Sequence, residues 1–122
     1  MTAQHTANCR QRVLIIEDET LVAMLLEDML DELGYAIVAH ASGLPEALAL
    51  ASTGQYEMAV LDINIIGGNS FPVAAVLDQR GIPFIFCSGY GQRAVPEAWA
   101  HHQCVGKPFT IAQLSTALEK LL

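Results

Sequence analysis

The chain has 122 residues, of which 52% are hydrophobic and 16% charged, a composition that indicates one globular domain and excludes a disordered chain. The formal net charge of −7 and the scattered lysines and arginines argue against binding to nucleic acid. No apolar run reaches the roughly 18 residues that a membrane span needs, and the polar N-terminus lacks a secretory signal, so we expect a cytoplasmic protein without a membrane partner.

Strand and helix patterns alternate along the chain. In chain order, the predicted elements are a strand over 12–16, a helix over 21–33, a strand over 36–40, a helix over 42–53, a strand over 58–61, a loop over 64–70, a helix over 72–79, a strand over 83–87, a short helix over 93–101, a strand over 103–105 and a helix over 111–122. Ser42 is the expected N-cap of the second helix, with Pro45 in its first turn.

Five strands that alternate with helices predict an α/β fold with a parallel sheet covered by helices on both faces. We expect a flexible tail over residues 1–11 and one domain over 12–122. The three cysteines are odd in number and form no Cys-x-x-Cys pair. Cys87 and Cys104 lie in apolar runs, so we expect reduced, buried thiols rather than a disulfide or a metal site.

Polar residues follow four of the predicted strands. Glu17 and Asp18 come after the first strand, Asp62 after the third, Ser88 after the fourth and Lys107 after the fifth. Each alone has an ordinary explanation, such as a turn residue, a helix-dipole partner or a surface charge. Because ligands bind beyond the carboxyl ends of strands in an open parallel sheet, the whole set predicts one site.

The residue types in this set suit phosphoryl transfer. Clustered carboxylates repel one another, and a hard cation such as Mg²⁺ relieves that repulsion. Lys107 would hold a phosphoryl oxygen, and the Ser88 hydroxyl and the Gly89 backbone N–H would hold another. Asp62 would then be the nucleophile that forms an acyl phosphate.

Over nearly its full length the chain resembles the receiver domains of two-component response regulators. The matching motifs are the acidic pair Glu17-Asp18, the strand VLDIN with Asp62, Ser88, and Lys107-Pro108-Phe109. The resemblance implies a flavodoxin-like sheet in the order 2-1-3-4-5 with five helices and a cis Lys107–Pro108 bond. It also implies that Asp62 accepts a phosphoryl group from a histidine kinase or a phosphotransfer protein.

The resemblance further implies a role for each site residue. Asp18, Asp62 and the backbone carbonyl of Asn64 would bind Mg²⁺, and Glu17 would act through water. The residues implied in phosphoryl binding are Ile63, Ser88, Gly89 and Lys107. Apart from Mg²⁺-dependent phosphorylation and dephosphorylation of itself, no enzymatic activity is expected.

The chain departs from the usual receiver pattern at several positions. Ile66 and Ser70 stand where most receivers have Pro and Gly, and Cys104 replaces the usual switch aromatic. The stretch PFIFCSGYG over 83–91 resembles a subgroup with a Phe-Ala-Thr-Gly-x-Tyr signature, whose members are often stand-alone receivers linked to atypical histidine kinases. Tyr90 is either the substitute for the missing switch aromatic or a loop residue that covers the core.

Trp99 and the pair His101-His102 lie within or just after the predicted short helix. Trp99 is expected in the partial core rather than at an interface, and the pair His101-His102 in a solvated loop rather than in a metal site.

With no output domain expected after the last helix, signalling would use the surface of the fourth helix, fifth strand and fifth helix. The alternatives are a phosphate-independent scaffold, an aspartate-based phosphatase, which Asn64 disfavours at the position of the general acid, and a flavin protein, which the acidic first loop disfavours.

Overall fold

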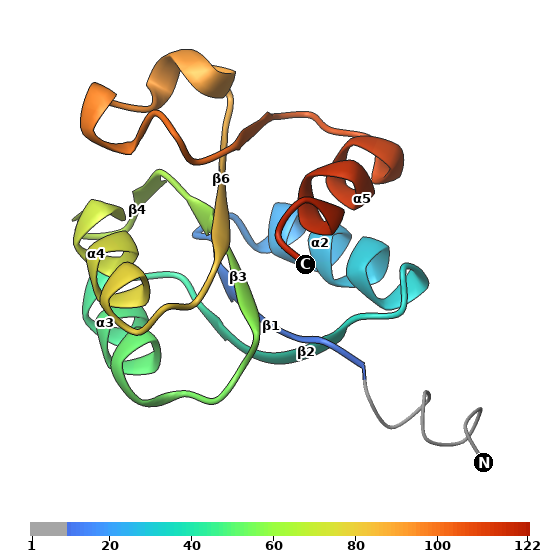
Figure 1. Ribbon diagram of the computed structural model, residues 1–122, viewed down its shortest axis with the longest axis horizontal. Helices are drawn as coiled ribbons and strands as arrows, with labels where there is room; N and C mark the ends of the chain where they lie inside the picture. The colour runs from blue at the N-terminus through green and yellow to red at the C-terminus, as the bar shows by residue number, and fades with distance from the viewer. Residues whose placement is uncertain (1–9) are drawn as a thin grey trace.

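The computed structural model describes residues 10–122, and its helices and strands follow the alternation in the sequence (Figure 1). The elements are β1 (Arg12–Ile16), α2 (Thr20–Glu32), β2 (Ala36–Ala41), α3 (Leu44–Thr53), β3 (Met58–Asp62), β4 (Asn64–Ile65), β5 (Gly68–Asn69), α4 (Phe71–Gln79), β6 (Phe84–Ser88), the 3₁₀ turns η1 (Gly91–Ala94) and η2 (Glu97–Trp99), β7 (Cys104–Gly106) and α5 (Ile111–Glu119). Residues 1–9 of the expected tail lie outside the described part. No helix within residues 10–122 is long and apolar enough to cross a membrane.

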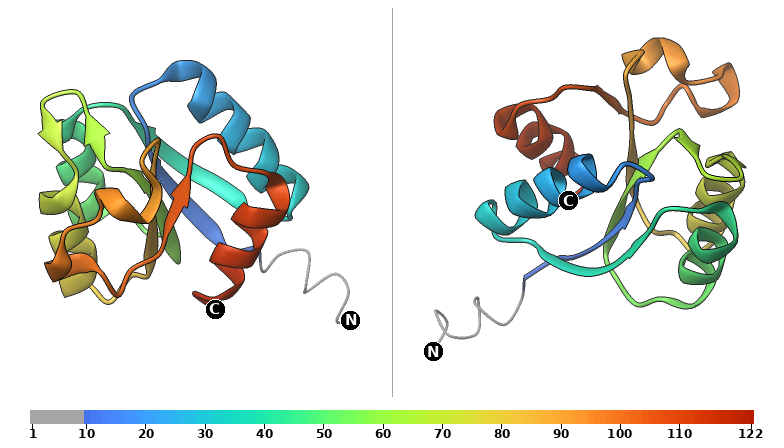
Figure 2. Two further views of the ribbon diagram at one scale, coloured as in Figure 1. Left: turned by 90° about the horizontal axis from the view of Figure 1, so that it is seen from above. Right: turned by 180° about the vertical axis from the view of Figure 1, so that it is seen from behind.

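The main sheet has five parallel strands in the order β2-β1-β3-β6-β7, which confirms the predicted order. Helices α3 and α4 cover one face, and α2 and α5 cover the other (Figures 1 and 2). Alternate residues of each central strand therefore enter different cores. In β1, Leu14 and Ile16 pack towards α3 and α4, while Val13 and Ile15 pack towards α2 and α5.

The predicted helix over 93–101 is wrong. Those residues form parts of two 3₁₀ turns, so the described chain has four α-helices rather than the five expected. Pro96 explains the break, because proline has no N–H to donate and disfavours helical geometry at the residue before it. Val95 is accordingly extended, with φ −91° and ψ 119°.

The predicted loop over 64–70 is a short antiparallel hairpin, in which Asn64 pairs with Asn69 and Ile65 with Gly68. Ile66 at its tip is bonded to the segment that joins β2 to α3, since the Leu44 N–H donates to the Ile66 carbonyl at 2.8 Å and the Ile66 N–H donates to the Ser42 carbonyl at 3.2 Å. Ser42 is therefore not the N-cap of α3; Gly43 occupies that position.

An aromatic cluster closes the α4 side of the sheet. Trp99 contacts Phe84 and Phe86 edge-on, with centroid separations of 6.2 and 6.4 Å, which confirms its place in the partial core. The expectation of a solvated histidine pair holds for His101, which is exposed, but not for His102. The His102 ring is half-buried and stacks on Phe84 at 4.3 Å. Burial and the neighbouring His101 lower the pKa of His102 below its usual 6.5.

Candidate functional site

The polar residues predicted at the strand ends meet in a cleft of about 460 Å³ at the carboxyl edge of the sheet. Its lining residues are Asp18, Glu19, Asp62, Asn64, Ser88, Gly89, Tyr90 and Lys107. Glu17 lies beneath the cleft, with no exposed surface. The structure thus brings together side chains that are up to 90 positions apart in the chain, because all of them leave the same edge of a parallel sheet.

Lys107 is the electrostatic centre of this cleft. Its Nζ lies 2.8 Å from Oε1 of Glu17, 3.1 Å from Oδ2 of Asp62 and 3.9 Å from Oε1 of Glu19. Two of these acids are nearly inaccessible to solvent, so the lysine supplies the compensation that buried carboxylates need.

The segment around Lys107 is anchored on its C-terminal side. The Lys107–Pro108 bond is cis, as expected. Thr110 then begins α5 with a capping box, in which its Oγ1 accepts from the Gln113 N–H at 3.1 Å and its own N–H donates to Oε1 of Gln113 at 2.8 Å. Helix α5 and strand β7 thus hold the lysine from both sides.

Two pKa shifts describe the charge balance. Burial, followed by repulsion from Glu17, raises the pKa of Asp62 from 3.8 to about 7, although Lys107 acts in the opposite direction. Burial by itself would lower the pKa of Lys107, but the acids around it outweigh burial and raise its pKa above the usual value. The cleft therefore holds more negative charge than one lysine neutralises.

Such a surplus of carboxylate oxygens fits a hard divalent cation. One oxygen each from Glu17, Asp18 and Glu19 lies within 4.8 Å of the others, and the Asp62 carboxylate approaches Glu17 within the same limit. Asn64 lies at the start of the hairpin, on the cleft wall. Side chains that could hold a cation are thus present, and a cation there would offset the repulsion from Glu17 that helps to raise the pKa of Asp62.

The loop after β6 forms the opposite wall. The Ser88 Oγ accepts a hydrogen bond from the Tyr90 N–H at 3.1 Å, which leaves its own proton free to donate. The Ile63 N–H donates to the Cys87 carbonyl at 3.2 Å, and the part of Ile63 in phosphoryl binding stays a prediction. The Tyr90 side chain is 75% exposed, so it does not cover the core. Its role as a switch remains a prediction.

Both described cysteines are free thiols, as expected. Cys87 is buried beside Asp62, its partner across β3 and β6, and burial raises its pKa above the usual value. Cys104, at the position of the missing switch aromatic, is half-buried, and burial raises its pKa to about 11. Neither thiol is poised for nucleophilic chemistry.

Two features of the site were not foreseen from the sequence. Glu19 lines the cleft, although only its place directly after Glu17-Asp18 pointed there. Glu17 pairs directly with Lys107, while its Oε2 accepts from the Glu19 N–H at 3.1 Å and its carbonyl contacts Nε2 of His40 at 2.9 Å. No local sequence pattern indicates which acid forms an ion pair with a lysine that is distant in the chain.

A five-stranded parallel sheet with an acid, a lysine and a hydroxyl converging at its carboxyl edge defines a class of phosphoacceptor signalling domains. The response regulator receiver domain model matches residues 13–119, and the chain belongs to this family. Receiver domains accept phosphoryl groups from kinases or phosphotransfer proteins, and they are generally signalling domains rather than enzymes.

Several named proteins are similar to this chain. The transcriptional regulatory protein PdtaR of Mycobacterium tuberculosis is 33% identical over 97% of this chain, and the phyllosphere-induced regulator PhyR of Methylorubrum extorquens is 32% identical over 95% of it. The chain spans only 60% and 45% of these relatives. The solution structure of SdrG from Sphingomonas melonis Fr1 is 38% identical with a TM-score of 0.82, over 92% of this chain and 96% of SdrG.

Proposed function

We propose that this protein accepts a phosphoryl group on Asp62 and signals in the cytoplasm by phosphorylation-dependent binding to another protein. The observation that carries the proposal is the pairing of Asp62 with Lys107 at 3.1 Å, in a cleft that also presents Asp18, Asn64 and Ser88. It is supported by the solution structure of a BeF₃-activated conformation of SdrG, which is 39% identical to this chain with a TM-score of 0.78.

The chemistry is a transfer between two nucleophiles. A carboxylate oxygen of Asp62 attacks the phosphorus of a phosphohistidine, the P–N bond breaks, and its electron pair stays on the histidine nitrogen. The ammonium of Lys107 pairs with one of the phosphoryl oxygens as negative charge develops on them. The Ser88 hydroxyl and the Gly89 N–H donate hydrogen bonds to another of these oxygens.

Asp18, Asp62 and the Asn64 carbonyl would hold Mg²⁺, with Glu17 acting through water. When bound, Mg²⁺ neutralises charge on the phosphoryl oxygens. Relieved by that positive charge of the repulsion from Glu17, Asp62 would be ionised and nucleophilic at neutral pH.

The apolar surface beside the cleft suits a helical phosphoryl donor. The α2 side chains Leu21, Met24 and Leu25 are 80%, 55% and 49% exposed. Leu25 also lines a pocket with Pro108 and Phe109, directly beside Lys107. A histidine kinase or phosphotransfer helix packed there would bring its phosphohistidine to Asp62.

The deciding experiment is the intact mass of the protein after incubation with acetyl phosphate and Mg²⁺. Wild type should gain one phosphoryl mass; Asp62→Asn should gain none, and neither should wild type in EDTA. Asp78→Asn, which changes an exposed acid on α4, is the matched control and should react like wild type.

A wild-type protein that gains no mass would be treated with beryllofluoride and Mg²⁺ and followed by ¹⁵N NMR. Amide shifts confined to the cleft would mean that the site is intact but selective for its protein donor. An unchanged spectrum would contradict the proposal and favour a phosphate-independent scaffold. Steady release of phosphate from an external phosphomonoester would instead indicate a phosphatase.

A further inference from the structure

Strand β7 is the edge of the main sheet, and one side of its backbone faces away from β6. The Phe86 N–H of β6 donates to the Gln103 carbonyl at 2.8 Å, and the Lys107 N–H donates to the Ser88 carbonyl at 2.9 Å. Since alternate residues of a strand direct their N–H and C=O groups to opposite sides, residues 102, 104 and 106 direct theirs to the open edge. An open edge of this kind accepts a further strand.

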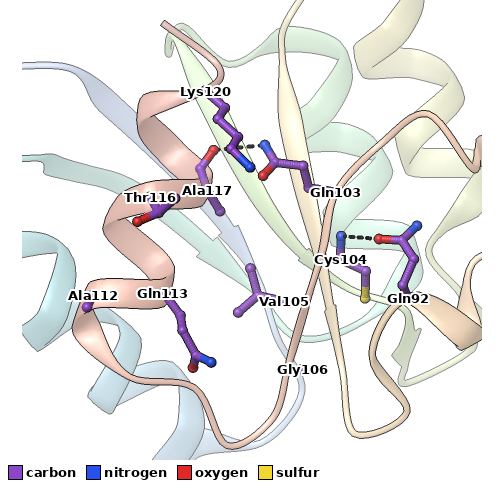
Figure 3. Close-up of a pocket in the computed structure, with 10 residues that line it drawn as sticks. All are labelled: Gln92, Gln103, Cys104, Val105, Gly106, Ala112, Gln113, Thr116, Ala117 and Lys120. Atoms are coloured by element: carbon purple, nitrogen blue, oxygen red, sulfur yellow. Dashed lines mark hydrogen bonds between the residues drawn. The ribbon is translucent and has the colours of Figure 1, made fainter.

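The side-chain amide of Gln92 occupies this edge. Its Oε1 accepts from the Cys104 N–H at 3.1 Å, and its Nε2 donates to the His102 carbonyl at 3.2 Å. Figure 3 shows the Gln92 amide beside Cys104, joined by a dashed line. A glutamine amide carries the same donor and acceptor as a peptide unit, so Gln92 makes the pair of bonds that a neighbouring strand would make.

The turn η1 packs against β6 and β7, and the Gln92 amide is held at the edge by these two bonds. Its side chain is exposed, and it belongs to the short turn η1, which begins at Gly91 with φ +62°. Each hydrogen bond between exposed groups contributes only a modest net free energy, because water replaces it when it breaks. The amide is therefore exchangeable.

The space beside the edge fits an extended peptide. A groove of about 580 Å³ runs along β7, from Gln92 to the residues of α5 that Figure 3 shows on the other side of the strand. Its floor includes Val105 and Ala117, and Lys120 supplies a positive charge on the α5 side. The chemistry selects an extended segment with an apolar side chain over Val105 and an acidic one near Lys120.

We propose that an extended segment of a partner protein adds to β7 as a further strand of the main sheet, displacing the amide of Gln92. Gln92 thereby acts as an intramolecular competitor that protects the edge when no partner is bound. The edge of β7 belongs to the signalling surface expected from the sequence, and the proposal specifies how a partner binds there; the binding itself does not require phosphorylation of Asp62.

The test begins with the full-length Gln92→Ala variant, used to select binders from a phage-displayed library of random linear peptides. The most enriched peptide is then titrated into wild type, Gln92→Ala and Arg93→Ala. Arg93 is an exposed neighbour on the same turn, and its variant should bind like wild type. Gln92→Ala should bind about tenfold more tightly than wild type, since no intramolecular bonds have to be broken first.

Two further measurements report the geometry of binding. In ¹⁵N NMR, the peptide should shift the amides of Cys104 and Gly106 and slow their hydrogen exchange. N-methylation of alternate peptide residues should abolish binding in one register and leave it intact in the other, because only one set of N–H groups faces β7. Gln92→Glu keeps the acceptor for Cys104 but loses the donor to His102, so it should bind with intermediate strength and provides a check should Gln92→Ala unfold.

The proposal is wrong if no peptide is enriched on Gln92→Ala, or if the enriched peptide binds all variants equally. Shifts that avoid β7, or binding that tolerates N-methylation in both registers, would exclude strand addition and point to a helical ligand or another surface. Dimerisation of Gln92→Ala in sedimentation would assign the edge to a second copy of this chain instead.

Discussion

At the residue scale, the cleft is defined by a charge imbalance around Asp62. Glu17 is fully buried and Asp62 is 7% exposed. Both carboxylates pair with Lys107, whose Nζ lies 2.8 Å from Oε1 of Glu17 and 3.1 Å from Oδ2 of Asp62, so one positive charge faces two negative charges. The ionised carboxylate of Asp62 is thus destabilised in the unphosphorylated protein. A bound cation or a phosphoryl group would relieve this destabilisation.

We therefore expect Asp62→Asn to stabilise the metal-free protein. In EDTA at about pH 8 the free energy of unfolding should rise by about 1–3 kcal/mol, because the amide removes a buried charge beside Glu17. The pKa of Asp62 is about 7 in the folded protein and 3.8 in the unfolded chain. The stability gained by Asp62→Asn should therefore vanish below about pH 3.8 and reach its full size above about pH 7. Urea unfolding across this pH range measures it.

Two comparisons strengthen that experiment. Asp28→Asn changes an exposed acid of α2 and should alter stability by less than about 0.5 kcal/mol. Excess Mg²⁺ should stabilise wild type more than Asp62→Asn, because the variant lacks a ligand. An Asp62→Asn variant that is less stable than wild type in EDTA would contradict the charge imbalance.

His102 leads to a second prediction at this scale. Its pKa is lowered by burial against Phe84 and by His101, so below about pH 6.5 the unfolded chain binds more protons than the folded one. The free energy of unfolding should therefore have its full value above that pH and should fall as the solution is acidified. His102→Phe keeps an aromatic ring on Phe84 without titrating, so its urea midpoint should depend less on pH; His101→Gln should retain most of the dependence.

At the scale of elements, the hairpin β4–β5 replaces the loop expected after Asp62 and places Asn64 on the cleft wall. Gly67, at its turn, has φ +99°, and a Cβ added there would lie 3.3 Å from the Cβ of Leu44. Only glycine adopts this conformation without strain while the hairpin is bonded to the segment that joins β2 to α3.

Gly67→Ala should therefore destabilise the protein by about 1–2 kcal/mol and weaken Mg²⁺ binding through displacement of Asn64. Thermal unfolding and a Mg²⁺ titration measure the two effects. The control is Gly106→Ala, because Gly106 has no positive φ and its added Cβ would meet only ordinary contact, 3.8 Å from the Cα of Gly91. Equal stabilities of the two variants would show that the hairpin is not strained by a side chain at position 67.

At the scale of the whole molecule, one sheet separates two cores. Leu26 of α2 lies in the core on one face and Leu77 of α4 in the core on the other, and both are fully buried. Because every central strand supplies residues to both cores, neither core can be lost while the sheet remains intact.

Leu26→Ala and Leu77→Ala should each cost about 2–5 kcal/mol. Both should unfold in a single urea transition, with the slope of wild type. Circular dichroism and Trp99 fluorescence report on different parts of the fold, and their curves should coincide for each variant. Two separate transitions in either variant would show that the two faces fold independently.

The amino-acid sequence by itself determined the order of the five strands of the main sheet and of the four α-helices, together with the polar residues that follow the strands. These features are encoded locally, because apolar periodicity, prolines and glycines act over a few positions. The carboxyl ends of parallel strands share one edge, so Asp18, Asp62, Ser88 and Lys107 could be assigned to one cleft without coordinates.

Only the tertiary structure decided which groups contact one another, because these partners are distant in the sequence. The hairpin at 64–69 is bonded through Ile66 to the segment that joins β2 to α3, and His102 is half-buried because its ring stacks on Phe84. Lys107 pairs with the buried Glu17, and Gln92 bonds to the open edge of β7. A side chain shows what it can donate or accept; which group lies within 3 Å of it depends on how the whole chain packs.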